Sequence, residues 1–355
     1  MPEPAPLVDD APSQRRDGAV LRSLVRWESA LLLLLGLTIL YGTSVSPAFL
    51  KSDNFFYIGL NVGEVAIMAL PLGLIVVTGE IDLSVASTLG LAGVVMAELF
   101  KHGWPIWPAM AGTLVLGAVA GALNGFLVTR VGLPSLAVTI GTLTLYRGIA
   151  QVILPTDTIS GFPASLANIG VVPIPGTQIP YSIVFFVVLA VLVGVVLHAT
   201  PLGRSIFAIG AGKEAAFFAG IRVKRIKFWL FVFSGTLSGF AGILWTLRFA
   251  SARYDSGVGL ELFVVTIVLL GGVSIFGGRG TIVGVLLAVV VLGCLQTALT
   301  LNLVSSQNQN IVIGGLLIVS VLLPNASDLY RRGRLRLRSA TARRHRRDRL
   351  PGERA

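Results

Sequence analysis

Apolar segments long enough to cross a bilayer follow one another along most of this 355-residue chain. A hydrocarbon core about 30 Å thick requires roughly 20 residues of helix, and this length divides the sequence into ten candidate spans. The sequence therefore predicts an all-α polytopic membrane protein, a bundle of about ten transmembrane helices. The expected spans are 28–46, 55–78, 83–100, 105–129, 133–154, 180–198, 227–249, 260–277, 281–303 and 308–324.

Composition points to the same class. Hydrophobic residues make up 54% of the chain and charged residues 13%, whereas soluble domains are about one quarter charged. The net charge of +11 does not indicate nucleic-acid binding, because residues 331–355 hold eleven Arg against two acidic residues, a net of +9. A basic tail beside a last span is what membrane orientation and attraction to anionic lipid produce. We expect lipid, and no nucleic acid, as a partner.

The loop charges predict the orientation. If the N-terminus is cytosolic, most basic loop residues fall on the cytosolic side, and both termini lie there. We expect a disordered lead-in at 1–27, a transmembrane domain at 28–324 and a cytosolic Arg-rich tail at 325–355. The cytosolic set contains Arg130, Arg279 and the basic residues of 201–227, the opposite set contains Lys51 and Lys101, and Arg248 and Arg253 are exceptions.

Residues 201–227 form the long polar interruption in the second half of the chain, with six basic residues. Inside it, the run from Lys213 to Gly220 is amphipathic and too short to span a bilayer. We expect a short helix at the membrane surface that another protein could grip, with its Phe residues facing away from its charged pair. The candidate coupling residues are Gly212, Lys213, Glu214, Ala215, Ala216, Phe217 and Gly220.

Signatures of catalysis are missing from the sequence. It has no phosphate-binding G-x-x-x-x-G-K-[ST], no G-x-S-x-G and no H-E-x-x-H. The three His residues lack metal-ligand spacing, and the single cysteine, Cys294, permits no internal disulfide. We predict a protein that is not an enzyme and that binds no metal or cofactor.

Polar groups at membrane depth are costly and usually paired or functional. Glu64 and Arg147 lie at similar expected depths, which suggests an ion pair between two helices. Direct contact with a substrate hydroxyl is the alternative. Uncharged polar residues within spans could bind a sugar or tie helices together; they are Asn61, Asn124, Thr139, Thr142, Thr144 and Gln296.

The turn at 78–84, TGEIDLS, connects two expected spans on the cytosolic side. Asp82 could cap the next helix or take part in gating, together with Gly79 and Ser84. Small residues four apart predict close helix packing. These are Gly59/Gly63, Gly117/Gly121/Gly125, Gly235/Gly239 and Gly280/Gly284.

Four motifs in order resemble the permease subunits of ribose-type ABC sugar importers. They are TGEIDLSVAST at 78–88, LNGFLVTRVGLPSLAVTIGTLTLYRGIA at 123–150, GRSIFAIGAGKEAAFFAGIRVKRIK at 203–227 and VLLGGVSIFGGRGTIVG at 268–284. Glu80 and Ala86 depart from the family pattern, which usually has Gly at the first position and often at the second. FASARYDSG at 249–257 is similar to permeases for rhamnose or autoinducer-2.

The resemblance implies a permease in the inner membrane of a bacterium that passes a monosaccharide. It implies a second permease chain, identical or different, a cytosolic ABC ATPase and an extracytoplasmic sugar-binding protein. ATP and Mg would bind to the ATPase, and residues 212–220 would be the helix that the ATPase grips. The alternative is an ion-coupled secondary transporter, for which Glu64 is the one candidate titratable group near the midplane.

Overall fold

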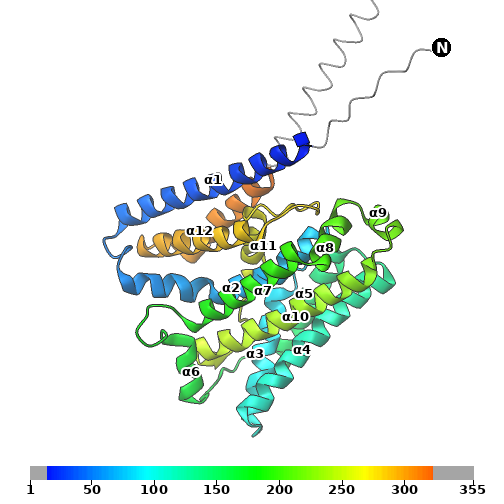
Figure 1. Ribbon diagram of the computed structural model, residues 1–355. Coiled ribbons are helices and arrows are strands. Elements are labelled where there is room, and N and C mark those ends of the chain that lie inside the picture. The colour runs from blue at the N-terminus through cyan, green and yellow to red at the C-terminus, as the bar shows by residue number, and fades with distance from the viewer. Residues whose placement is uncertain (1–13, 323–355) are drawn as a thin grey trace, which may run out of the picture.

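Helices make up most of the computed structural model, which describes residues 14–322, with side chains described from Trp27 onward (Figure 1). Two short strands, β1 (Ile159–Ser160) and β2 (Ser251–Ala252), pair antiparallel. The helices are α1 (Gln14–Val45), α2 (Ser52–Val77), α3 (Val85–Lys101), α4 (Ile106–Phe126), the π-helix η1 (Leu127–Val131), α5 (Ser135–Ile153), α6 (Ala164–Val171), α7 (Tyr181–Ala199), α8 (Pro201–Ala211), α9 (Lys213–Phe218), α10 (Val223–Arg248), α11 (Leu260–Leu270), α12 (Ile282–Leu301) and an unlabelled helix, Ser306–Leu322.

Seven helices among the described residues are long and apolar enough to cross a membrane. A helix lies at each of the ten predicted positions, but α3, α11 and Ser306–Leu322 are shorter than the seven. The all-α membrane class is thus confirmed, while the number ten stays a prediction. The Arg-rich tail at 325–355 lies outside the described residues, as does 1–13 of the predicted lead-in.

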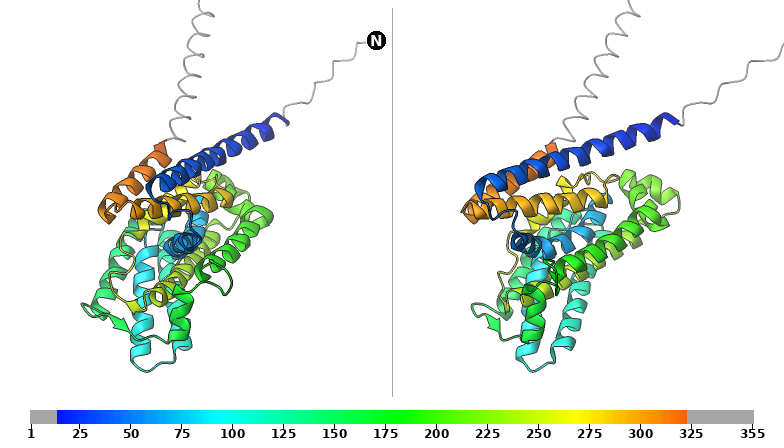
Figure 2. Two further views of the ribbon diagram at one scale, coloured as in Figure 1. Left: turned by 90° about the vertical axis from the view of Figure 1, so that its left-hand side faces the viewer. Right: turned by 60° about the vertical axis from the view of Figure 1, so that its left-hand side comes forward.

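The long helices run side by side between two ends of the bundle, and α9 lies at one of them, called here the α9 end (Figures 1 and 2). At the α9 end, the Gly278 amide donates to the Val77 carbonyl at 2.8 Å. At the opposite end, the Asn302 side chain donates to the Tyr41 hydroxyl at 2.9 Å. Successive long helices therefore alternate in direction, as the loop charges predict; which end is cytosolic stays a prediction.

The centre of the bundle is α2. In its most apolar window 94% of residues are buried, against 28% for α7. Helices α7, α10, α11 and α12 contact α2, whereas α3 and α4 pack on α10 and the tip of their hairpin projects at the bottom of Figure 2. A helix that is apolar all round is expected to be surrounded by other helices, and α2 is such a helix.

Helices α4 and α10 touch backbone to backbone. A methyl group added at Gly121 would meet the backbone of Phe231, and one added at Gly235 would meet the backbone of Gly117. On the other side of the bundle, Gly59 lies against Pro180 at the start of α7. The glycine spacing in the sequence therefore predicted real close-packed interfaces, since small residues allow helices to approach closely in a membrane.

Between α10 and α11 the chain folds back into the bundle. After β2, Gly257 reaches Leu89 of α3, which also contacts Gly242, six residues before the end of α10. We call residues 249–259 the re-entrant loop. The helix after this loop, α11, begins at Leu260 as predicted but ends at Leu270, seven residues before the end of the predicted span 260–277, so it has 11 residues, about 16 Å of helix at 1.5 Å per residue. Irregular backbone at this depth is tolerated where it is enclosed by protein or lines a cavity.

Candidate functional site

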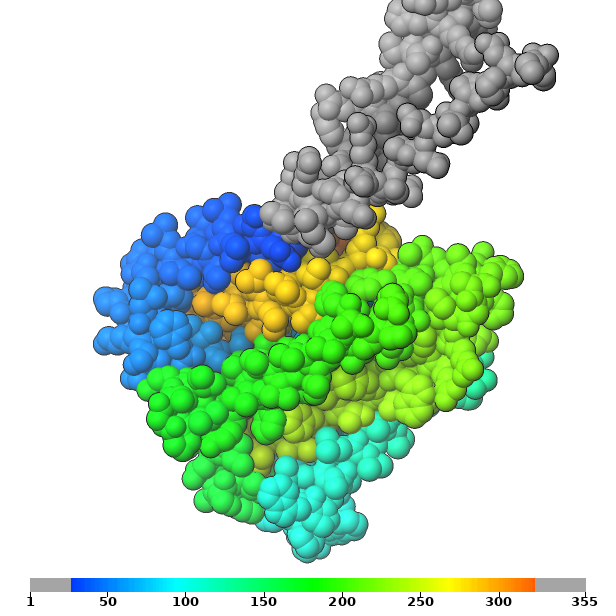
Figure 3. All heavy atoms as spheres, in the orientation of Figure 1, coloured from blue at the N-terminus to red at the C-terminus, as the bar shows by residue number. Residues whose placement is uncertain are grey.

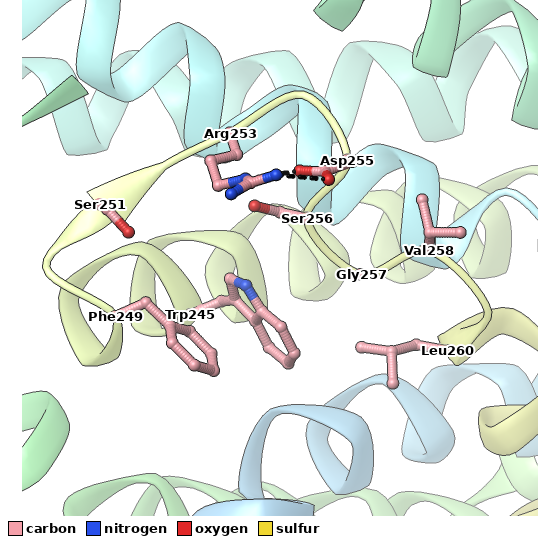
Figure 4. A pocket seen from close by; sticks show the side chains of 9 residues that line it. All are labelled: Trp245, Phe249, Ser251, Arg253, Asp255, Ser256, Gly257, Val258 and Leu260. Carbon is pink, nitrogen blue, oxygen red and sulfur yellow. Dashed lines mark hydrogen bonds and ion pairs between the residues drawn. The ribbon is translucent and has the colours of Figure 1, made fainter. Parts of the chain in front are cut away.

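A cavity of about 330 Å³ opens beside the re-entrant loop (Figure 4). The rings of Trp245 and Phe249 lie 4.8 Å apart and form an apolar wall. Figure 4 shows polar side chains from the loop on the other side, where Arg253 donates two hydrogen bonds to Asp255 at 2.8 and 2.9 Å. These bonds hold the pKa of Asp255 below its ordinary value. An aromatic wall facing a few polar groups is a common arrangement for binding a small polar molecule.

Arg147 of α5 holds the re-entrant loop through hydrogen bonds to the loop backbone. Its Nη1 donates to the carbonyl oxygens of Ser256 at 2.6 Å and Tyr254 at 3.1 Å. Because both acceptors are backbone carbonyls, the guanidinium determines the path of the loop without depending on loop side chains. The sequence placed Arg147 in a pair with Glu64, and that prediction is wrong.

Glu64 pairs instead with Arg248, the last residue of α10, at 3.1 Å. Arg248 also donates to the side-chain oxygen of Asn61 at 2.9 Å and to the carbonyl of Leu60. Matching depths along two helices do not decide which faces meet, and the α5 face that carries Arg147 is turned toward the re-entrant loop. The cluster joins α2 to α10 near the end opposite α9, and Asn61 serves as a tie between helices.

The turn between α2 and α3 is held by a buried polar network. Asp82 accepts hydrogen bonds from the amide and hydroxyl of Ser84, at 3.0 and 2.7 Å, and from Ser234 of α10 at 2.9 Å. Asn124 of α4 donates to the Ser84 hydroxyl at 2.8 Å. Helix α3 has Ser84 at its N-cap position, so Asp82 does not fill the N-cap, one of the two roles that the sequence allowed; the gating role stays a prediction. Together, Asp82 and Ser84 join the turn to α10 and α4.

The same turn is tied to the start of α10. Glu80 forms an ion pair with Lys227, whose Nζ lies 2.5 Å from Oε1, and Lys227 is buried. Thr139 of α5 donates to the Ile81 carbonyl at 3.3 Å, while Thr142 bonds within its own helix. Glu80 was noted in the sequence as a departure from the family pattern, but its partner Lys227 gave no signal there.

Two other candidate residues form no hydrogen bond within these networks through a side chain. Gly79 is exposed with φ at 78°, a conformation that favours glycine. Gln296 of α12 has a buried side-chain oxygen without a hydrogen-bond partner among the described residues. Those residues also contain no group of three His, Cys, Asp or Glu side chains that could hold a metal ion.

The predicted surface helix forms as α9. Ala216 faces inward against Ile209 and Val223, whereas Phe217 and Phe218 are 67% and 85% exposed. Gly220 ends the segment with φ at 81°. The remaining candidates, Lys213, Glu214 and Ala215, are exposed, and Gly212 is the N-cap. The segment thus presents two aromatic rings to the surroundings at one end of the bundle.

Residues 54–321 match the profile of a family described as branched-chain amino acid transport system / permease component. The chain belongs to this family. The permease is 33% identical to the autoinducer 2 import system permease protein LsrD of Klebsiella pneumoniae over 304 residues, which are 84% of this chain and 91% of the relative. It is also 33% identical to the D-allose transport system permease protein AlsC of Escherichia coli over 282 residues, 79% and 86% of the two chains.

No solved structure matches the permease. Its family consists of the membrane components of ABC importers, in which the ATPase is a separate chain, so the permease is a non-catalytic subunit. The seven long apolar helices within residues 14–322 agree with a multi-pass protein of the inner membrane. The resemblance seen in the sequence is therefore confirmed at the level of the family.

Proposed function

We propose that the permease passes a monosaccharide or a sugar-like molecule into the cell, powered by a cytosolic ATPase and supplied by an extracytoplasmic binding protein. The substrate class is supported by the relatives, which are named for autoinducer-2 and allose. The same proposal makes the α9 end cytosolic. The permease itself then needs no cofactor, because ATP and Mg bind to the partner.

The observation that carries the proposal is the exposure of Phe217 and Phe218 on α9. Helix α9 has six residues and lies at the end of the bundle. Its two large exposed rings need a partner to cover them, since exposed apolar groups of this kind mark interaction sites. An amphipathic helix is commonly received by an apolar groove in another protein. We assign that groove to the ATPase.

The substrate enters at the opposite end, beside the re-entrant loop. The cavity there offers Trp245 and Phe249 for stacking and Ser251, Arg253 and Asp255 for hydrogen bonding. A half-length helix that follows irregular backbone is typical of binding sites in transporters. The exposed pair Arg253 and Asp255 also suits docking of the binding protein, where rim charges set association rate and specificity.

A second permease chain, identical or different, covers the outward face of α5. This face exposes Thr144 and Gln151, and the space around Gly141 and Gly148 is open. The Thr144 hydroxyl donates to the Ile140 carbonyl of its own helix, but hydrocarbon would leave the Gln151 amide unsatisfied, whereas a neighbouring chain can bond it and can approach closely over glycine. The pathway then runs between two α5 helices.

The test replaces both rings of α9 with charge, as Phe217→Asp/Phe218→Asp. We expect the double variant to fold, to lose copurification of the ATPase and to lose uptake of labelled sugars. Phe55→Asp is the control, because Phe55 is similarly exposed, at 54%, at the start of α2 and far from α9. If the ATPase still copurifies with the double variant, the coupling assignment is wrong.

A panel of competing sugars, including allose, rhamnose and autoinducer-2, would then identify the substrate in the intact importer. Uptake that persists without the ATPase and stops when the proton gradient collapses would support the ion-coupled alternative. Glu64, the carboxylate on which that alternative depends, is paired with Arg248, and no relative favours it.

A further inference from the structure

A groove of about 830 Å³ lies between α4 and α10 at the α9 end, and the transport mechanism above makes no use of it. Its walls combine three cations with three aromatic rings. The lining residues are Phe126, Arg130, Lys224, Arg225, Phe228 and Trp229.

The two walls repeat one pattern. Helix α4 continues into η1 toward the α9 end, and α10 starts there and runs the other way, as the contact of Gly125 with Phe228 shows. On the first wall, Arg130 lies one turn beyond Phe126. On the second, Lys224 and Arg225 lie one turn before Phe228 and Trp229. Both walls therefore place cations at the end of the bundle and aromatic rings about 6 Å deeper, four residues at 1.5 Å each.

The cations are available for a ligand. Arg130, Lys224 and Arg225 are exposed, and none of them forms an ion pair within the side chains described, residues 27–322. The rings beneath them are accessible too, with Phe126 and Trp229 exposed by 50% and 57%. Phe228 packs edge to face against Trp229 with 5.5 Å between ring centroids, which fixes the floor of the groove.

We infer that this groove binds an acidic phospholipid of the inner leaflet, with its phosphate among the cations and its acyl chains over the rings. Basic pockets between transmembrane helices at the cytoplasmic boundary bind anionic headgroups, and Trp at this depth is suited to the interface. A soluble anion would have no use for the three rings. An acidic protein surface would pair with the three cations but would leave the three rings in contact with lipid. The layering of charge over aromatic groups therefore favours a lipid.

The experiment follows Trp229 in the full-length permease, reconstituted in phosphatidylcholine with a small share of brominated phosphatidylglycerol. Subtracting the signal of Trp229→Phe isolates the fluorescence of this residue. We expect brominated phosphatidylglycerol to quench Trp229 well beyond brominated phosphatidylcholine. In Arg130→Gln/Arg225→Gln, the preference should fall by about tenfold or more, since each basic side chain near the surface contributes about 1 kcal/mol.

Two variants serve as controls. Arg204→Gln/Arg279→Gln removes the same charge from exposed positions outside the groove and should retain the preference. Arg130→Lys/Arg225→Lys keeps the charge and should retain most of it. Equal quenching by both lipids, or equal loss in both Gln pairs, would overturn the inference, the latter because only total charge would then matter.

Two further outcomes would also overturn it. Displacement of the lipid signal by millimolar inorganic phosphate would assign the groove to a soluble anion. Loss of ATPase binding in Arg130→Gln/Arg225→Gln, with quenching unchanged, would assign it to the ATPase. Size-exclusion profiles of every variant confirm that the protein compared is folded.

Discussion

Helices α5 and α7 are alike in length and burial but differ in what they present outward. Both have 19 residues, and 28% of the apolar window is buried in each, yet the mean hydropathy is 1.4 for α5 and 2.8 for α7. The outward face of α7 crosses the molecule in Figure 3 as a green band. It exposes Val184, Phe185, Val187, Val188, Val191, Leu192 and Val195.

The face of α5 is mixed. Thr144 and Gln151 stand among its apolar side chains, and Gly141 and Gly148 leave gaps in its surface. Lipid tails can cover the α7 face at no cost, but they cannot satisfy the amide of Gln151. Two equally exposed helices thus differ in chemistry: the face of α7 suits contact with lipid, and the face of α5 suits the second chain proposed above.

A charge at the middle of each helix gives the largest contrast. Val191→Arg on α7 should reduce the amount of folded protein by at least about tenfold, since an Arg at the centre of a lipid-facing helix costs about 3 kcal/mol. Thr144→Arg on α5 should cost much less, because water in the pathway proposed beside this face would hydrate the guanidinium. Fluorescence-detected size exclusion measures both. If Val191→Arg folds as well as Thr144→Arg, the α7 face does not border lipid.

The inner sides of the two helices differ as well. Arg147→Gln should lower uptake by at least about tenfold, because the re-entrant loop loses two hydrogen bonds from a charged group, and one such bond alone contributes about 1.5–3 kcal/mol. Arg147→Lys should recover part of this activity. Ser182→Ala, on the inner side of α7, should change little, because its hydroxyl has no partner in residues 27–322. Equal effects at the two sites would contradict the role given to Arg147.

A bulky aromatic ring introduced on the outward face should affect uptake in α5 but not in α7. Gly148→Phe should reduce uptake more than about tenfold, equivalent to roughly 1.4 kcal/mol lost from assembly, because the ring keeps a second chain away from α5. Val188→Phe on α7 is the control and should transport normally. Cysteine cross-linking reads the same contact: Gly141→Cys should link two copies if the pair is homodimeric, and Val187→Cys should not. Normal uptake by Gly148→Phe would remove the second chain from this face.

The smallest expected effect is that of a substitution in the re-entrant loop, which Arg147 of α5 supports. Asp255→Asn should lower stability by under about 1 kcal/mol, since an exposed pair is screened by solvent. The Arg253 hydrogen bonds lower the pKa of Asp255 in the folded protein. Their contribution is therefore complete above the ordinary Asp pKa of about 4 and is lost as the pH falls through the lower folded value. Thermal unfolding of both proteins between pH 3 and pH 7 tests this; a gap that widens toward pH 3 would contradict it.

Hydropathy predicted the helices, and glycine spacing predicted which segments pack closely, because both properties are local to a helix; that α4 packs against α10 came from the structure. The α9 segment was predictable for the same reason. The partner of Glu64 was not, since pairing depends on how each helix is rotated about its axis, and that is set by the whole bundle. The role of α9 and of the pathway residues stays a prediction.

The re-entrant loop was missed although the sequence carried a signal for it. The apolar run of α11 is short, and it is flanked by Gly257 and Gly259 on one side and Gly271 and Gly272 on the other. A short hydrophobic segment interrupted by glycines is a marker of a broken helix. The requirement for about 20 residues per span concealed it, because the glycine-rich residues 271–277 were counted into the span.

The contact of α4 with α10 has a mechanical consequence. Gly117 and Gly121 bring the two backbones together with no side chain between them to absorb displacement. Helix α10 has 26 residues, about 39 Å at 1.5 Å per residue. A displacement of Val223 at the α9 end would then move Arg248 at the opposite end, because α4 and α10 would shift together as one rigid pair. The cavity beside the re-entrant loop would change shape as a result.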